Sequence, residues 1–195
     1  MTKRIAIIQG HPDPQGGHFC HALADSYRAG AEAAGHVVDI IDTGQFDLPH
    51  IRNQAQWKAP PTDERILHMQ AIVGAADHLV IIYPLWLGDM PAILKSALEH
   101  LSCGGFVMSV DDKGRWQQGL KGKSARVVVT MGMPALVYRL YFLSHSLKSL
   151  ERNILKFAGV KPVRTTLMGR VEGESRAAQR EAWLTQMHSL GGDAA

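Results

Sequence analysis

The sequence has few of the features that mark secreted, metal-binding or membrane-spanning chains. Its only cysteines, Cys20 and Cys103, are too few for a disulfide framework and lack the CxxC spacing of zinc ligands. We therefore expect a reducing compartment, the cytoplasm, and no metal. No stretch approaches the roughly eighteen uninterrupted apolar residues of a membrane span, and the apolar run at residues 5–8 is too short for a signal peptide. We expect no membrane insertion.

Runs of one charge, internal repeats and low-complexity tracts are also missing. The formal net charge is +3 over 195 residues, and the basic residues are scattered. A polyanion-binding surface is not required by such a composition, so we expect no nucleic-acid partner. With 46% hydrophobic and 20% charged residues, the chain has ordinary globular proportions and predicts a single domain over residues 1–195.

Short runs rich in Val and Ile alternate with helical stretches along the chain. Strands are predicted at 4–9, 37–42, 78–83, 125–130 and 164–168, and helices at 19–34, 63–76, 91–101, 138–158 and 174–190. The first four strands are almost continuously apolar, which is typical of a parallel sheet covered on both faces. Right-handed crossovers favour an α/β doubly wound sheet in the order 2-1-3-4-5, with ligands beyond the carboxyl ends of the strands.

The first of these strand ends leads into a Gly- and Pro-rich turn, GHPDPQGGHFC at residues 10–20. Gly16 and Gly17 allow backbone N–H groups to converge, the following helix adds its positive N-terminus, and His11 and His18 can donate hydrogen bonds. The turn therefore suits a phosphate, although it has neither the GxGxxG nor the GK[ST] pattern. A βα turn without ligand remains an equal alternative from these residues alone.

Two further strand ends also suit a ligand. The segment YPLWLGDMP at residues 83–91 is aromatic and apolar where polar loop residues are usual, which indicates either a flat apolar ligand or a core Trp that seals the sheet. The segment TMGMP at residues 130–134 ends its strand with a glycine that allows close backbone approach. Three neighbouring edges of this kind favour a common site.

The segments GHPDPQGGHFCHAL, YPLWLGDMPAILK and GRWQQGLKGKSARVVVTMGMP together resemble the flavodoxin-like NAD(P)H:quinone oxidoreductases. The resemblance runs from about residue 3 to residue 169, and PLW…PAILK is its most specific element. It implies a flavodoxin-like three-layer sandwich and a flavin at the strand ends, with FAD named first and FMN as the alternative. It also implies NADH or NADPH as co-substrate, a quinone-like acceptor and a homodimer.

Carried across residue by residue, the resemblance places three sets of cofactor-binding residues. The flavin phosphate is expected at His11, Gly17, His18, Phe19 and Cys20. The ring is expected beside Pro84, Leu85, Trp86 and Leu87, and its polar edge beside Thr130, Met131 and Gly132. Two departures stand out, because His18 replaces the usual Ser and methionines at 131 and 133 replace Gly and Ser.

Family members also carry a Tyr and a His after the third turn, and Tyr138 and His145 resemble them as catalytic residues, the His one position late. They would stabilise the negative charge that reduction places near the flavin's pyrimidine edge. The apolar strip at residues 136–150 predicts core packing or a subunit interface. Transfer from NAD(P)H to flavin and then to the acceptor in one cavity implies ping-pong kinetics.

Other functions remain open from the sequence. Cys20 near a helix start could be a nucleophile, although no orienting third residue is evident and packing explains it more simply. A flavodoxin-type electron carrier is disfavoured by the basic pI of about 9.0. A quinone-reductase-like regulatory subunit of a membrane transporter is the remaining alternative, since proteins that resemble this one also serve in that way.

Overall fold

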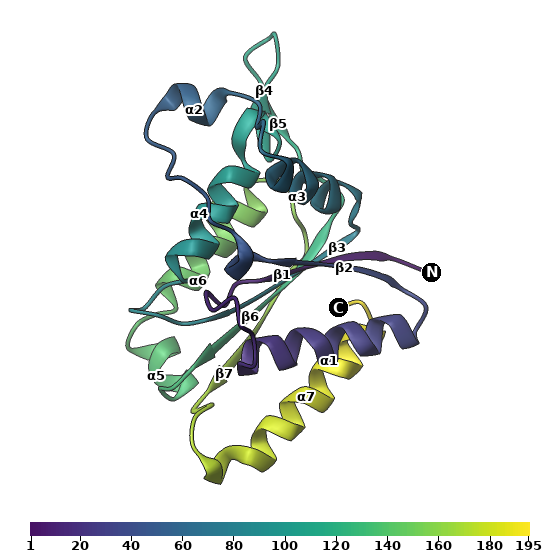
Figure 1. Cartoon of the computed structure of the whole chain (residues 1–195), viewed down its shortest axis with the longest axis vertical. Coiled ribbons are helices and arrows are strands. Elements are labelled where there is room, and N and C mark those ends of the chain that lie inside the picture. Colours follow the sequence, from purple (N-terminus) through teal and green to yellow (C-terminus); the bar gives the residue numbers. More distant parts are fainter.

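The computed structural model describes residues 1–195. The fold is built on a five-stranded parallel sheet in the order β2-β1-β3-β6-β7 (Figure 1). The strands are β1 (Arg4–Gln9), β2 (Val37–Asp42), β3 (His78–Pro84), β6 (Ser124–Met131) and β7 (Val163–Gly169). Each lies within one residue of its predicted bounds, and the predicted order 2-1-3-4-5 is confirmed when these five strands are counted along the chain. The apolar runs formed strands because their side chains are buried on both faces.

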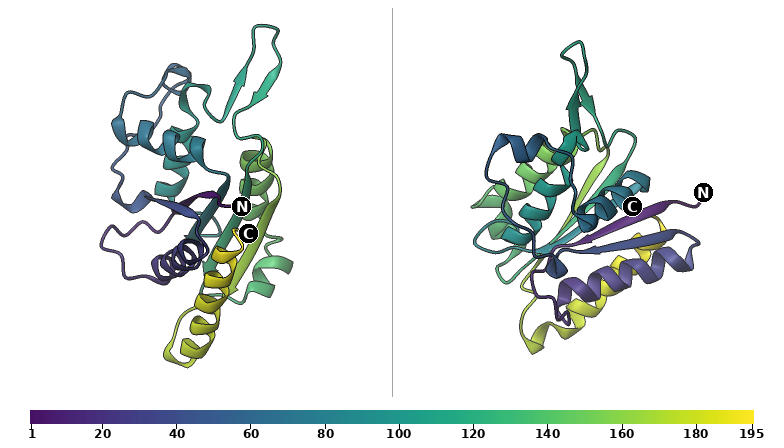
Figure 2. Two further views of the ribbon diagram at one scale, coloured as in Figure 1. Left: turned by 90° about the vertical axis from the view of Figure 1, so that its right-hand side faces the viewer. Right: turned by 45° about the horizontal axis from the view of Figure 1, so that its top comes forward.

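Helices cover both faces of the sheet. The helices α1 (Phe19–Ala33) and α7 (Ala177–Gly192) pack on one face, and α3 (Glu64–Ala75) and α4 (Ala92–Leu101) pack on the other (Figures 1 and 2). Alternate residues of β1 separate the two cores: Ile5 and Ile7 face α1 and α7, while Ala6 and Ile8 face α3 and α4. The result is the expected three-layer sandwich.

The helices α1 and α7 cross in direct backbone contact. A Cβ added at Gly30 would lie 1.9 Å from the carbonyl oxygen of His188, and one added at Gly191 would lie 2.0 Å from that of Tyr27. Only glycine permits this approach. Ser26 Oγ donates to the carbonyl of Leu184 at 2.7 Å and fixes the crossing.

The predicted continuous helix over residues 138–158 is wrong. The segment forms α5 (Ala135–Leu140), α6 (His145–Ser149) and the π-helix η3 (Leu150–Lys156), and Leu143 and Ser144 between the first two have left-handed φ values of 52° and 51°. No Gly or Pro marks this break in the sequence. Tertiary hydrogen bonds hold it instead, because the buried Tyr138 hydroxyl bonds to Ser146 Oγ and to the backbone N–H of Leu147.

Several short elements were not predicted from the sequence. They are the 3₁₀ turn η1 (Thr43–Gln45), the helix α2 (Gln54–Lys58), the 3₁₀ turn η2 (Cys103–Gly105), and the antiparallel hairpin of β4 (Met108–Val110) and β5 (Trp116–Gln118). The first three residues of the helix predicted at 174–190 form the 3₁₀ turn η4 (Glu174–Arg176), which leads directly into α7. The hairpin projects away from the sandwich (Figure 2). No helix combines the length and the apolar composition that crossing a bilayer requires.

Candidate functional site

The turns that follow β1, β3 and β6 meet at the carboxyl edge of the sheet. β3 lies between the other two strands, with Gln9 opposite Ile82 and Thr130 opposite Pro84. Hydrogen bonds join the starts of the turns: Gly10 N–H donates to the Ile82 carbonyl at 2.7 Å, and Leu85 N–H donates to the Thr130 carbonyl at 2.8 Å. The sheet therefore brings together the three segments that were predicted to form one site.

The first turn presents an open helix N-terminus. His18 is the N-cap of α1, its side chain makes no capping hydrogen bond, and the backbone N–H groups of Phe19 and Cys20 have no acceptor within the chain. Gly16 and Gly17 have positive φ values of 73° and 77°, and a Cβ at Gly17 would meet nothing within 4 Å. Free N–H groups and the helix dipole make this turn suitable for an anion.

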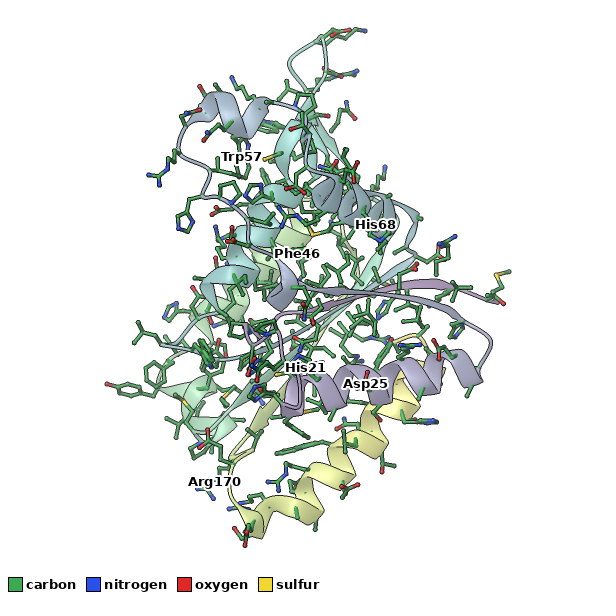
Figure 3. The ribbon with its side chains drawn as sticks, in the orientation of Figure 1. His21, Asp25, Phe46, Trp57, His68 and Arg170 are labelled. Atoms are coloured by element: carbon green, nitrogen blue, oxygen red, sulfur yellow. The ribbon has the colours of Figure 1, made fainter.

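Three histidines gather around this helix start. The rings of His11 and His18 stack with centroids 3.9 Å apart, and the ring of His21 lies 5.4 Å and 5.8 Å from them. Figure 3 shows His21 at the beginning of α1. Burial, together with the positive charge available on His18 and His21, lowers the pKa of His11 to about 4, so His11 is neutral near pH 7.

An acidic residue that the sequence analysis overlooked stands in the same turn. Asp13 Oδ2 lies 2.7 Å from His18 Nε2, and Asp13 Oδ1 accepts from the N–H of Gln15 at 2.9 Å. The hydrogen bond from His18, followed by that from Gln15, lowers the pKa of Asp13. An Asx turn of the pattern D-x-Q is the signal that could have found it.

The second turn displays aromatic and apolar surface. Trp86 is 52% exposed, and its ring meets that of His11 edge to face with centroids 6.0 Å apart. Leu87 is fully exposed with a left-handed φ of 48°, and paired backbone hydrogen bonds between Trp86 and Asp89 close the turn. Pro84 and Leu85 are half-buried beneath it. The Trp is not a core residue that seals the sheet.

The third turn is held by contacts from both sides. Thr130 Oγ1 lies 3.2 Å from Cys20 Sγ, which links β6 to the start of α1, and Met131 is buried. Gly132 is exposed, and a Cβ added there would lie 2.9 Å from Glu172 Oε1. Glu172 is a second acidic residue that sequence reasoning missed, because it comes from the turn after the weakly predicted last strand.

Tyr138 and His145 lie on either side of the break between α5 and α6. Tyr138 is 1% exposed, and its hydroxyl lies 2.7 Å from Ser146 Oγ and accepts from Leu147 N–H at 3.2 Å. His145 is exposed. The tyrosine hydroxyl is therefore engaged inside the fold, and the catalytic assignment of both residues stays a prediction.

Cys20 has the environment of a packed thiol. It is 2% exposed, and burial raises its pKa to about 11. A nucleophilic cysteine needs a lowered pKa, so the alternative of a reactive Cys20 is contradicted. No group of three His, Cys, Asp or Glu side chains has the geometry to hold a metal ion.

A family model described as the flavodoxin-like fold matches residues 3–190. The chain belongs to this family. Among curated relatives, the FMN-dependent NADH:quinone oxidoreductase of Ruegeria pomeroyi is 28% identical over 149 residues, which cover 68% of this chain and 72% of the relative. The chain spans 57% and 52% of the length of two further curated relatives.

Solved structures of similar proteins have the same flavodoxin-like fold as this chain. The NAD(P)H:quinone oxidoreductase from Methanothermobacter marburgensis superposes with a TM-score of 0.80 at 21% identity, covering 99% of this chain and 96% of that one. The FMN-dependent NADH-azoreductase from Bacillus anthracis, solved with FMN, gives a TM-score of 0.73 at 15% identity and covers 98% and 99%. The family resemblance found in the sequence is confirmed.

Proposed function

We propose that this chain is an FMN-dependent NAD(P)H:quinone oxidoreductase. The observation that carries the proposal is the meeting of an open helix N-terminus with three histidines, an exposed tryptophan turn and a glycine turn at one edge of the sheet. Curated relatives named as quinone oxidoreductases support the reaction class. An exposed Trp beside an anion site is the pairing that an aromatic ring with a phosphate tail needs.

Orphaned polar atoms at the same edge fit a polar ligand. Gln9 Nε2 and both ring nitrogens of His21 are buried without a hydrogen-bond partner in the chain. Buried polar groups are seldom left unpaired in folded proteins. The free N–H groups of Phe19 and Cys20, with His18 at the N-cap, would hold the flavin phosphate, and Gly17 leaves room for it.

The choice of flavin differs from the first expectation. FAD was named first from the sequence, whereas the relatives whose names state a flavin are FMN-dependent. FMN is therefore the proposed cofactor. When bound, it supplies the two-electron chemistry that accepts a hydride from a nicotinamide and passes it to a quinone.

The remaining turns would orient the ring and the substrates. Trp86 and Leu87 present an apolar wall beside which a flat ring can lie, while the exposed Gly132, which follows the buried Thr130 and Met131, would approach its polar edge. Glu172 lies next to Gly132 and disfavours negative charge on that side. NAD(P)H and the quinone would use the same open surface in turn, which gives ping-pong kinetics.

A homodimer would complete this open edge. The side chains of the strip that follows the third turn are apolar and exposed on the single chain, and they are Leu136, Val137, Leu140, Tyr141, Phe142 and Leu143. An apolar surface of this kind is typical of a subunit interface. The strip follows the third turn directly, so a second copy packed on it would lie beside the flavin.

Titration of the purified chain with FMN, riboflavin and FAD, followed by flavin fluorescence, tests the cofactor. We expect stoichiometric FMN binding at micromolar concentration and much weaker riboflavin binding, because riboflavin lacks the phosphate. Steady-state rates with NADH and a soluble quinone should then give parallel double-reciprocal lines. Equal affinity for FMN and riboflavin would show that the phosphate does not contribute to binding and would contradict the proposed phosphate site. Absence of any flavin binding would contradict the proposed oxidoreductase function.

A further inference from the structure

A side chain that can change charge stands at the proposed phosphate site. His18 is the N-cap residue of α1, directly before the free N–H groups of Phe19 and Cys20. Its side chain makes no capping hydrogen bond and is 43% exposed, so it is open to solvent and to a ligand. Histidine side chains ordinarily change charge between about pH 5 and pH 8, so a phosphate bound here would lie beside a group that can gain a proton.

The two ring nitrogens of His18 have different surroundings. Nε2 lies 2.7 Å from Asp13 Oδ2, whereas Nδ1 has no hydrogen-bond partner within the chain. A neutral imidazole carries one hydrogen, and a carboxylate only accepts, so Asp13 holds the hydrogen of a neutral ring on Nε2. Nδ1 then presents a lone pair, which a phosphate oxygen would repel. Protonation places a second hydrogen on Nδ1, and only the protonated ring can donate to Asp13 and to a phosphate together.

The charges at the site favour the same protonated ring. The Asp13 carboxylate places one negative charge in hydrogen-bond contact with His18, and the FMN phosphate would add between about one and a half and two more near pH 7. Opposite charges within about 4–6 Å favour the charged form of an ionisable group. A proton would therefore be taken up from the solvent when the phosphate binds.

The neighbouring histidines are poorer proton acceptors than His18. His11 stacks on His18 with centroids 3.9 Å apart, but its Nδ1 accepts a hydrogen bond from the backbone N–H of Asp13 at 3.2 Å, which requires an unprotonated nitrogen. Burial, followed by the charges available on His18 and His21, lowers the pKa of His11 to about 4. His21 lies 5.8 Å from His18 between ring centroids, and both of its ring nitrogens are buried away from a ligand.

The charged groups of the other elements around this turn are engaged elsewhere. Asp42, at the end of β2, and Asp89, in the turn after β3, accept backbone N–H bonds within their own turns at 3.0 Å and 2.7 Å. On the side of α7, Trp183 presents an uncharged ring to the start of α1. Asp13 is therefore the carboxylate that pairs with His18, and the proton balance of the site depends on these two side chains and the ligand.

We propose, on the basis of the FMN-binding function proposed above, that FMN binding is coupled to the uptake of one proton by His18. In the complex Nε2–H donates to Asp13 and Nδ1–H donates to the phosphate. The protonated ring binds FMN more tightly, so FMN affinity is highest at the acidic end of the neutral range and falls as pH rises and the proton is lost. Retention of the cofactor is thereby regulated by pH.

The titration of the phosphate itself predicts the opposite trend. Its second ionisation falls near pH 6, so the dianion, which an anion site binds more tightly, is gained as pH rises. A pH dependence that came from the phosphate alone would therefore strengthen FMN binding with rising pH, or leave it unchanged well above pH 6. A fall in affinity over this range indicates a group on the protein that loses a proton.

Isothermal titration calorimetry of the full chain with FMN measures the coupling. Between about pH 6.5 and pH 8.5 the affinity should fall roughly threefold to tenfold, within the limit of tenfold per pH unit that linkage sets for one proton. At a fixed pH within this range, the observed binding enthalpy should differ between Tris and HEPES buffers in proportion to the protons taken up. Riboflavin, which lacks the phosphate, should show neither effect.

Two glutamine variants provide the matched comparison. Glutamine keeps a hydrogen-bond donor at the N-cap but cannot gain a proton, so His18→Gln should lose both the pH dependence and the buffer dependence of FMN binding. Its affinity for riboflavin should equal that of the unmodified chain, which shows that the variant is folded. His68→Gln, at an exposed position of α3, should keep the full dependence.

The proposal is overturned if FMN affinity does not fall with rising pH, or if His18→Gln keeps the dependence of the unmodified chain. FMN binding that is tighter than riboflavin binding but independent of pH would overturn the proton coupling and leave the proposed function intact. Absence of any flavin binding would overturn both.

Discussion

His18 Nε2 lies 2.7 Å from Asp13 Oδ2 in the turn that opens toward the start of α1. The imidazole that would meet a flavin phosphate is thus already paired with a carboxylate of the same turn. Both side chains are about two-fifths exposed, so the pair itself adds little stability. The pair matters for ligand binding, because a bound phosphate and the Asp13 carboxylate would repel each other and compete for the same hydrogen-bond donor, the His18 ring.

Replacement of Asp13 by Asn should therefore strengthen FMN binding. The substitution removes a negative charge near the phosphate and frees His18 to bond with it, so we expect an affinity gain of roughly threefold to tenfold. Fluorescence titration at low ionic strength measures it. Asp25→Asn is the matched control, because Asp25 is exposed on α1, away from the turn (Figure 3), and its replacement should leave FMN affinity unchanged. Weaker binding in Asp13→Asn would show that Asp13 orients His18 and does not compete.

His18→Asp should have the opposite effect. A carboxylate at the N-cap of α1 would face the phosphate, and we expect a loss on the order of 2 kcal/mol or more, which is roughly thirtyfold in affinity. His18→Ser should be mild. Riboflavin binding should change much less than FMN binding in His18→Asp, and an unchanged FMN affinity would show that the phosphate binds elsewhere.

Tyr138→Phe separates a structural role from a catalytic one. The hydroxyl joins α5 to α6 through Ser146 and Leu147, so its loss should lower the free energy of unfolding by about 1–2 kcal/mol. Urea unfolding measures this change. The anaerobic rate of flavin reduction should fall less than about threefold, whereas direct donation to the flavin predicts a fall of about tenfold to a hundredfold. The larger fall with unchanged stability would support the catalytic assignment, which stays a prediction.

The buried His78 should make stability fall in mild acid. Its pKa is lowered from 6.5 to about 4, so between those pH values the unfolded chain takes up a proton that the folded chain does not. The free energy of unfolding should therefore decrease as pH falls through that window, by a contribution on the order of 3 kcal/mol. Urea unfolding from pH 7 to pH 4 in buffer without phosphate or carboxylate measures it. His78→Gln should make the profile shallower without flattening it, because the pKa of His11 is also lowered to about 4 and His11 contributes in the same window, whereas His68→Gln, at an exposed position of α3, should leave the profile unchanged.

The sheet and the three site turns could be predicted because they depend on local patterns. Runs such as VVVT at residues 127–130 are typical of a covered parallel sheet, and the handedness of crossovers then indicates which turns are neighbours. The position of Trp86 on the surface required the structure, since the same residue at a strand end also fits a core position.

The missed features depend on side-chain contacts that form only once the chain has folded, some of them between residues near in sequence and one between separate strands. The break at Leu143 and Ser144 has no Gly or Pro, and it is held by Tyr138, whose partner Ser146 lies eight residues further along the chain. Glu172 approaches Gly132 only because β7 pairs with β6. Asp13 was visible in the sequence, but its pairing with His18 depends on how the turn folds.

Anaerobic reduction of the FMN-loaded protein tests the central proposal most directly. After FMN reconstitution and removal of free flavin, stoichiometric NADH or NADPH should bleach the visible flavin band, and a quinone added next should restore it without oxygen. Both steps are expected, because the proposed site serves the nicotinamide and the quinone in turn. A protein that retains FMN while neither nicotinamide bleaches it would contradict an NAD(P)H:quinone oxidoreductase.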